Sequence, residues 1–322
     1  MWGTTVGVTH EQKIDAAPEK VWALLTAPAA LTAMPGHRFA FPVPAAVPGT
    51  DRLCCVIVAG KRGVDCAVVD AREEVPGQLI CWQARSTQPT GPQTLTLTLS
   101  VRPQRGGCML GIVVGGSHPR MSKAERRNWL HTTSAWAGSL RAIAEGEEPW
   151  PPVGLPADVR EACAAPPQPG KTVQGGGTVH INAAADAVWE MVWAPETSRL
   201  IDPDTVAWAG TVPGTPLRAV GEMQCSVERR PDDRFAARIY TVSELTWGRR
   251  AVTQAPGPPW AEVDHLVTPA DGGTRLEMTS RRSADLLRKA DAEGVADAMA
   301  RQMQAAADGY KAVIEKAAGP PS

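Results

Sequence analysis

The stretch Ile14–Trp22, IDAAPEKVW, decides the fold, because a close variant of it, INAAADAVW, returns at Ile181–Trp189. Aligning Thr5–Trp22 with Thr172–Trp189 gives seven identical residues in eighteen positions. A match separated by about half the chain indicates a duplicated domain, since repeat arrays have much shorter periods. The sequence therefore predicts one fold that occurs twice.

Further matched segments extend the duplication. VPGT begins at Val47 and again at Val212, and VRPQRGG at Val101 resembles VTPADGG at Val267. The spacing between matched segments drifts by only a few residues, as expected when loops differ in length and elements correspond. The duplication therefore covers most of the chain.

A proline-rich segment separates the two copies. Residues 149–170 contain seven prolines, and proline removes a backbone donor and fixes φ. This segment is predicted to be a semi-rigid linker without helix or strand. The 322 residues suit two domains, and the predicted domains are residues 1–148 and 171–319.

Each copy is predicted to run from a short strand to a helix, then through several antiparallel strands to one long helix. Asp15 and Asn182 are the expected N-caps of the first helices, with Pro18 in the first turn. The long helices are expected at about Ser122–Glu145 and about Ala284–Ala318, each with an apolar face. The predicted class is α+β, with each curved antiparallel sheet wrapped around a long C-terminal helix and a cavity between them.

Composition excludes several classes of function. The chain carries 33 basic and 34 acidic residues, so no global field attracts nucleic acid or a membrane surface. No run of eighteen apolar residues and no signal-peptide pattern is present, so we expect a cytoplasmic protein without membrane insertion. The seven cysteines include no C-x-x-C pair, so we expect reduced, mostly buried thiols. No phosphate-binding, dinucleotide-binding or zinc-protease motif is present, and we expect no cofactor and no metal.

The strand-to-helix corner, the VPGT segments, the V-x-P-x-x-G-G hairpins and the terminal amphipathic helices together resemble the SRPBCC superfamily. This resemblance implies the helix-grip fold of START-type lipid-transfer domains, pollen allergens and polyketide cyclases. Two tandem helix-grip domains are most similar to the didomain aromatase/cyclases of bacterial aromatic polyketide pathways. Members of the superfamily bind lipids and hormones, activate chaperones, or fold and dehydrate polyketide chains, so the fold alone does not select a function.

The strand that enters each V-x-P hairpin is expected to point alternate residues inward, counted back from the valine. His265 then occupies the position that Leu99 has in the first copy. An imidazole on an apolar wall is a candidate general acid/base, and a core histidine hydrogen-bonded to backbone or water is the alternative. The expected inward residues are Leu95, Leu97, Leu99 and Val101 in the first copy and Ala261, Val263, His265 and Val267 in the second.

Other side chains are candidates for the same site. Tyr240 and Arg238 are candidate catalytic residues, because a phenol or a guanidinium can polarise a ketone oxygen. His37 and Arg38, after MPG, are expected to lie in a loop and are candidates for contacting a phosphopantetheine or a carboxylate, or are simply solvated. Large apolar and aromatic residues are candidate ligand contacts or ordinary core. These are Trp82, Trp129, Trp136, Trp189, Trp247, Met299, Met303 and Tyr310.

Three functions remain open at this point. The first is a cofactor-independent cyclase/aromatase of bacterial secondary metabolism, which holds a polyketide-like or other hydrophobic intermediate between sheet and long helix. The second is a non-catalytic protein that binds or carries a hydrophobic small molecule such as a lipid or polyketide. The third is a chaperone-activator-like interaction protein that uses the outer face of a sheet. A hydrophobic small molecule is the expected partner, and an acyl carrier protein is a candidate second partner. The apolar wall of the first copy suggests one structural and one functional half.

Overall fold

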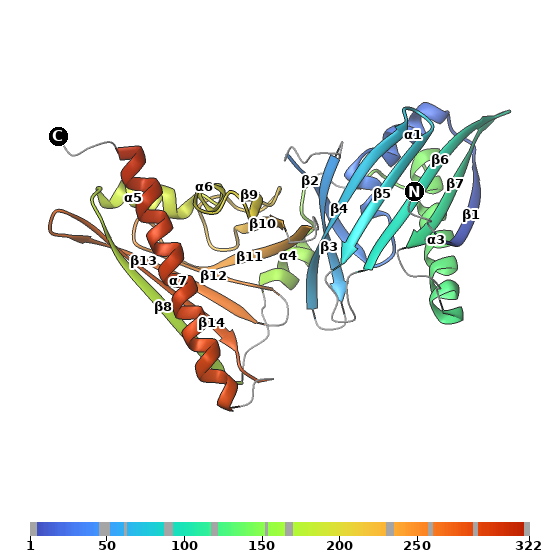
Figure 1. Cartoon of the computed structure of the whole chain (residues 1–322). Helices are drawn as coiled ribbons and strands as arrows, with labels where there is room; N and C mark the ends of the chain where they lie inside the picture. The colour runs from blue at the N-terminus through green and yellow to red at the C-terminus, as the bar shows by residue number, and fades with distance from the viewer. Residues whose placement is uncertain are drawn as a thin grey trace. The chain divides into compact units, whose positions relative to one another are not determined.

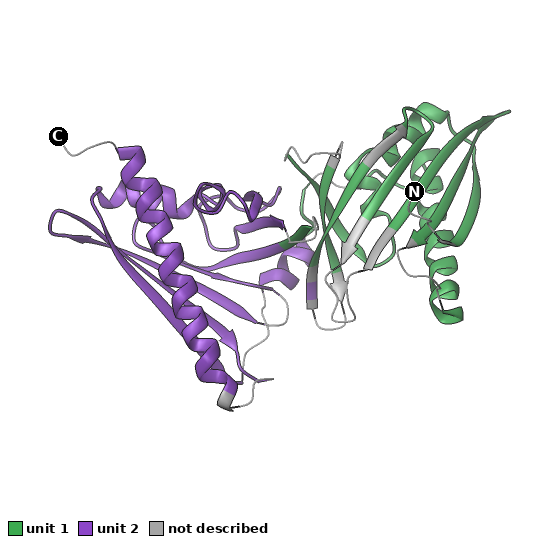
Figure 2. Cartoon of the chain, in the orientation of Figure 1, with its two compact units in different colours: residues 1–60, 65–156, 230–237 green, residues 61–64, 157–229, 238–322 purple. Residues whose placement is uncertain are grey.

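A computed structural model of the chain describes residues 5–44, 52–60, 63–86, 93–116, 122–151, 154–164, 170–229, 235–256, 260–285 and 289–318. The chain divides into two compact units, coloured separately in Figure 2. The first unit comprises residues 1–60, 65–156 and 230–237, and the second comprises residues 61–64, 157–229 and 238–322.

The first unit is a seven-stranded sheet with a long helix packed on it (Figure 1). The strand order is β1-β7-β6-β5-β4-β3-β2, so only the contact of β1 with β7 joins strands distant in sequence. Its elements are β1 (Thr5–Ile14), α1 (Pro18–Leu25), α2 (Pro28–Thr32), β2 (His37–Val43), β3 (Arg52–Gly60), β4 (Gly63–Val75), β5 (Leu79–Ser86), β6 (Gln93–Gln104), β7 (Gly107–Gly116) and α3 (Lys123–Glu145).

The second unit repeats this arrangement with the order β8-β14-β13-β12-β11-β10-β9, and the long helix α7 crosses its sheet (Figure 1). The predicted α+β class with two helix-grip units is confirmed. Its elements are α4 (Ala157–Ala164), β8 (Thr172–Ile181), α5 (Ala185–Trp193), α6 (Thr197–Ile201), β9 (Val206–Thr211), β10 (Met223–Arg229), β11 (Phe235–Thr246), β12 (Arg250–Gln254), β13 (Ala261–Ala270), β14 (Gly273–Ser283) and α7 (Lys289–Ala318).

The strand-to-helix corner forms as predicted, but its caps differ. Ala17 is the N-cap of α1 and Ala184 that of α5, and neither makes a side-chain cap hydrogen bond. The prediction that Asp15 caps α1 is wrong, because its carboxylate pairs with Lys13 at 2.7 Å. Pro18 at the first helical position sets the helical φ without a cap, since its missing N–H would have no partner there.

Two segments expected to be irregular carry regular structure. His37 begins strand β2, so the prediction of a loop there is wrong, and its Nδ1 lies 2.7 Å from the Leu31 carbonyl oxygen. The segment 149–170 was predicted to lack helix, but its middle forms α4. Prolines stand only outside α4, and the apolar side chain of Val159 is buried, so this stretch folds onto the second unit.

The long helix of the second unit approaches β8 closely because two glycines face it. A Cβ added at Gly175 would lie 2.3 Å from the Ala300 backbone nitrogen, and one at Gly177 would lie 2.4 Å from that of Gln304. The described part of α7 is Lys289–Ala318, and Asp285, which was predicted to lie in this helix, instead accepts hydrogen bonds from the backbone nitrogens of Gly170 and Lys171. The glycines therefore fix how near α7 lies to the sheet.

Candidate functional site

The two long helices are anchored by equivalent hydrogen bonds, which lets the two copies be compared position by position. Glu145 of α3 accepts from the Asp15 backbone nitrogen, and Glu315 of α7 accepts from that of Asn182, both at 2.8 Å. Residues 170 apart on these helices are therefore equivalent. By this rule Leu140 corresponds to Tyr310 and Trp136 to Ala306, two of the matched positions discussed below.

The sheets supply two more matched positions. Leu97 of β6 pairs with Trp82 of β5, and Val263 of β13 pairs with Thr253 of β12. Residues directly opposite in an antiparallel pair point to the same face of the sheet. Trp82 therefore corresponds to Thr253, just as Leu99 corresponds to His265.

In the first unit these positions are filled by large apolar groups. Trp82, Leu99, Trp136 and Leu140 are all completely buried in one apolar core. The side chains of Leu97 and Val101 are buried as well. The side chain of Leu95 lies outside the described residues. Trp82 and Trp136, predicted as ligand contacts, fill the interior of this unit, and Trp129 packs against the same core. The first unit thus has a close-packed interior.

In the second unit the same four positions hold Thr253, His265, Ala306 and Tyr310. Two tryptophans are replaced by small residues, and two leucines by ring side chains that carry polar atoms. His265, Val263 and Ala306 keep accessible surface even though they lie between the sheet and α7. Accessible space therefore adjoins this face, which we call the inner wall of the second unit.

His265 and Tyr310 face each other across the inner wall. Their ring centroids lie 6.4 Å apart and the ring planes are nearly perpendicular. Among the described residues neither ring makes a hydrogen bond, so the alternative of a core histidine bonded to the backbone has no support in this structure. Both rings present free hydrogen-bonding groups to the accessible space.

The surroundings fix the protonation states of this pair. Burial lowers the pKa of His265 to about 4, and the neighbouring Asp264 carboxylate only partly offsets this. Burial raises the pKa of Tyr310 to about 12. At neutral pH the site therefore holds a neutral imidazole, which can accept a proton, beside a protonated phenol, which can donate a hydrogen bond.

Arg238 and Tyr240 form a second polar group on the same sheet. Both have the parity in β11 of Val242, a core residue of this unit, so they point to the inner face. The Arg238 Nε lies 3.2 Å from a carboxylate oxygen of Glu228 on β10. Burial alone would lower the pKa of Arg238, but Tyr240 and Glu228 raise it above its ordinary value. The guanidinium is thus already paired, and it lies apart from the His265–Tyr310 pair by sheet position.

The remaining predicted contacts lie around the inner wall. Met299 and Met303 are buried on α7. Trp189 is buried on α5, and the ring of Trp247 meets it edge-on at 5.8 Å. The Arg218 guanidinium carbon lies 4.8 Å from the centre of the Trp247 ring, so this half-exposed tryptophan is covered by a cation on one side.

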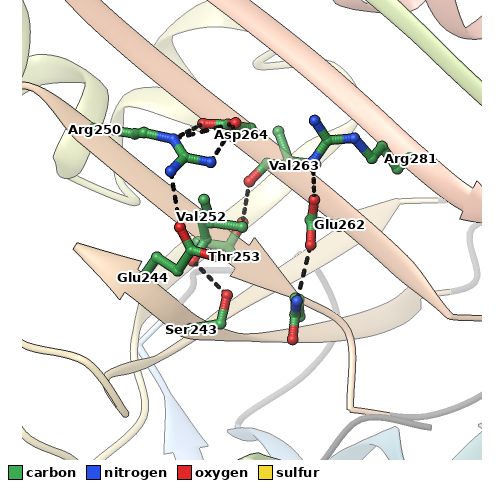
Figure 3. A network of polar contacts seen from close by, with 10 residues as sticks. Ser243, Glu244, Arg250, Val252, Thr253, Glu262, Val263, Asp264 and Arg281 are labelled. Carbon is green, nitrogen blue, oxygen red and sulfur yellow. Dashed lines mark hydrogen bonds and ion pairs between the residues drawn. The ribbon is translucent and has the colours of Figure 1, made fainter. Parts of the chain in front are cut away.

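The outer face of the same sheet carries paired charges (Figure 3). Arg250 contacts Asp264 at 2.9 Å and Glu244 at 2.8 Å, while Glu262 pairs with Arg281. Glu262 and Asp264 alternate with Val263 and His265 along β13. The paired carboxylates on the outer face therefore help to hold His265 on the inner face, since a one-residue slip would move both acids to the inner face and break their ion pairs.

Sequence reasoning missed three features of this site. The contact of Tyr310 with His265 is not visible in any local pattern, because it joins a strand and a helix 45 residues apart. The two others are Thr253 and Ala306, which occupy the positions that tryptophans have in the first copy. The match of Gln83-Ala84 with Gln254-Ala255 was a usable signal, because it aligns the preceding Trp82 with Thr253.

Comparisons with known proteins return distant structural likenesses. No protein-family model matches the chain, and no curated protein matches it. The di-domain ARO/CYC protein StfQ from the steffimycin biosynthetic pathway is 13% identical with a TM-score of 0.36, over 97% of this chain and 100% of that chain. The di-domain ARO/CYC protein BexL is 14% identical with a TM-score of 0.37, over 98% and 99%. A START superfamily protein from Mycobacterium smegmatis is 14% identical with a TM-score of 0.35, over 44% and 98%.

At these identities and TM-scores the likenesses establish no activity for this chain. Two further observations concern the cysteines and the possibility of membrane-spanning helices. No disulfide joins any of the seven cysteines, which all lie in the described part of the chain, and five of them are buried, as predicted. None of the helices in the described part of the chain is long and apolar enough to cross a membrane.

Proposed function

We propose that the second unit is a cofactor-independent cyclase/aromatase that acts on a polyketide-like or other hydrophobic polyketone. The observation that carries the proposal is the His265–Tyr310 pair, two polar rings without hydrogen bonds beside the apolar cluster of the second unit. Its counterpart in the first unit is the buried leucine pair Leu99 and Leu140. Polar groups that converge on an apolar pocket are the usual mark of a site that orients and activates a ligand.

The pair can perform the proton transfers that such a ring closure needs. The neutral His265 imidazole takes a proton from a carbon beside a carbonyl group, and the Tyr310 phenol donates a hydrogen bond to the carbonyl oxygen that becomes the enolate oxygen. The enolate carbon then attacks a second carbonyl carbon of the same chain, which forms the ring bond and an alkoxide. The imidazolium returns its proton to this alkoxide. Loss of water from the resulting alcohol completes the aromatic ring without an oxidant or reductant.

The apolar remainder of the wall supports the fit of a hydrophobic chain. Val263, Leu245 and Met303 belong to or pack against the same cluster as Tyr310, and none of them offers a competing nucleophile. A folded chain held against this surface has its reacting carbons brought together, which lowers the entropic part of the barrier. The same wall equally suits a carrier of hydrophobic molecules, which is therefore the second candidate function.

The interaction-protein alternative has less support, because the described charges on the outer face of this sheet are paired with one another (Figure 3). An acyl carrier protein as second partner and a cytoplasmic location stay predictions.

The proposal is tested with a synthetic linear triketone whose cyclised phenol is detected by absorbance. His265→Leu is expected to lower turnover by on the order of 10² to 10⁴, the usual share of a positioned acid/base, while triketone affinity changes little. Tyr310→Phe should lower turnover by about 10². His131→Leu, on the exposed face of α3, is the matched control and should change neither quantity. Full turnover by a folded His265→Leu protein refutes the mechanism, and binding of the triketone without turnover by the unmodified protein favours the carrier function.

A further inference from the structure

We infer that the inner wall of the second unit ends in an anion site at Arg282, so that its ligand is an elongated hydrophobic molecule with a carboxylate or phosphate at one end. The inference rests on the proposed function in one respect, namely that the inner wall binds a ligand. It goes further in assigning the chemistry of the ligand's far end.

The alternation of β14 places Arg282 on the inner face. Leu276 and Met278 belong to the core beneath α7, and Ser280 is buried in the same register. Arg282 follows two residues later, and one of its terminal nitrogens lies 3.3 Å from the side-chain oxygen of Gln302 on α7. The guanidinium therefore extends from the inner face of the sheet to an exposed residue at the edge of the long helix.

The hydrogen-bonding capacity of Arg282 is largely unused. Its Nε is buried without a hydrogen-bond partner, and no ion pair joins the guanidinium to a carboxylate within the described residues. The neighbouring Arg281, which points outward, pairs with Glu262. A buried donor on a cation is costly to leave unsatisfied, and a planar guanidinium suits carboxylate and phosphate oxygens.

Small side chains flank Arg282 within the sheet. Its direct neighbours across the sheet are Ala261 on β13 and Val173 on β8, both small and both partly exposed. Beyond β13 and β12 the same face of the sheet reaches β11, where Arg238 is paired with Glu228. An acidic group can therefore approach Arg282 without displacing a large side chain.

The sheet also sets the length of the ligand. Ala261 and His265 lie four residues apart on one face of β13, which corresponds to about 13 Å at 3.3 Å per residue. The anion and the reacting carbonyl should be separated by about this distance. A chain of roughly ten atoms spans it, so a long-chain acid fits and a compact acid does not.

The test compares a dansyl-labelled undecanoic acid with its methyl ester and with the corresponding phosphate monoester, by fluorescence titration of the full chain. The unmodified protein should bind the acid about tenfold to a hundredfold more tightly than the ester, as a charge-assisted hydrogen bond predicts. Arg282→Gln should remove this preference and leave ester affinity unchanged, and Arg282→Lys should restore part of it. Arg275→Gln, an exposed arginine on the outer face of the same strand, is the control and should keep the preference.

The outcomes of this titration distinguish failure of the anion site from failure of the proposed function. Equal affinity for acid and ester in the unmodified protein, or an acid preference that survives Arg282→Gln, overturns the inference while leaving the proposed function intact. Failure of every probe to bind overturns both. A stronger preference for the phosphate than for the acid identifies phosphate as the natural group. Because the ratio is measured on one preparation, a partly unfolded variant lowers both signals alike and the ratio stays readable.

Discussion

Acidification should destabilise the second unit through His265. The folded protein holds this imidazole neutral, since burial lowers its pKa from 6.5 to about 4. In the unfolded chain the same group protonates at its ordinary value. Between these two values the unfolded state binds more protons than the folded state, so the free energy of unfolding falls as pH falls through this window.

The size of the effect follows from the two pKa values. Each pH unit inside the window contributes about 1.4 kcal/mol, so lowering the pH from about 6.5 to about 5 should cost at most about 2 kcal/mol through this one group. Because His265 keeps some accessible surface, the loss of unfolding free energy should be somewhat smaller than this limit. Above the ordinary value of 6.5 the contribution of His265 should be constant.

Urea unfolding of the unmodified protein and of His265→Leu, each at about pH 7.5 and about pH 5, isolates this contribution. Burial also lowers the pKa of His37 in the first unit, so the unmodified protein alone does not suffice. The difference between the two pH values should be about 1–2 kcal/mol smaller in His265→Leu than in the unmodified protein. An equal pH dependence in both proteins would show that the ring is not held neutral by burial, and the proton-accepting role would lose its basis.

Three further predictions concern the architecture. Thr253→Trp, which restores the residue type of the first unit, should fill the space at the inner wall and weaken binding of a hydrophobic probe at least about tenfold while the protein stays folded, as seen by calorimetry and titration. Gly177→Ala should push α7 from β8 and lower the free energy of unfolding by about 1–3 kcal/mol, whereas Gly176→Ala on the other face should cost less, as measured by urea unfolding. Limited proteolysis should cut first within residues 149–170 and outside α4, and earlier cutting inside either sheet would contradict the domain boundaries.

Much of the fold follows from local signals in the sequence. The duplicated corner at Trp22 and Trp189 and the two V-x-P hairpins each depend on neighbouring residues, so a pattern identifies them. Counting back from the hairpin valine also placed His265 on the inner side, because side-chain alternation along a strand is strict. Elements without such a signal were missed. β2 contains Pro42 and lies at the sheet edge, where proline is tolerated. α4 is short and is flanked by prolines, which indicate a linker when the sequence is considered alone.

The candidate site on the inner wall could be predicted only in part, for a different reason. Its chemistry lies in pairs of residues far apart in sequence, such as His265 with Tyr310 and Arg282 with Gln302. No single-strand or single-helix pattern reports which strand residue meets which helix residue. The change from Trp82 to Thr253 becomes meaningful only once strand register shows that both occupy one place in the fold.

The central claim is that the second unit, and not the first, holds the ligand. Photolabelling of the full chain with a long-chain fatty acid that carries a diazirine, followed by peptide mapping, tests this claim directly. The label should fall on β13 near His265 and on α7 between Met299 and Tyr310, and an excess of unlabelled acid should displace it. Labelling of the first unit around Trp82 and Trp136, or displacement-insensitive labelling of the outer faces alone, would contradict the account.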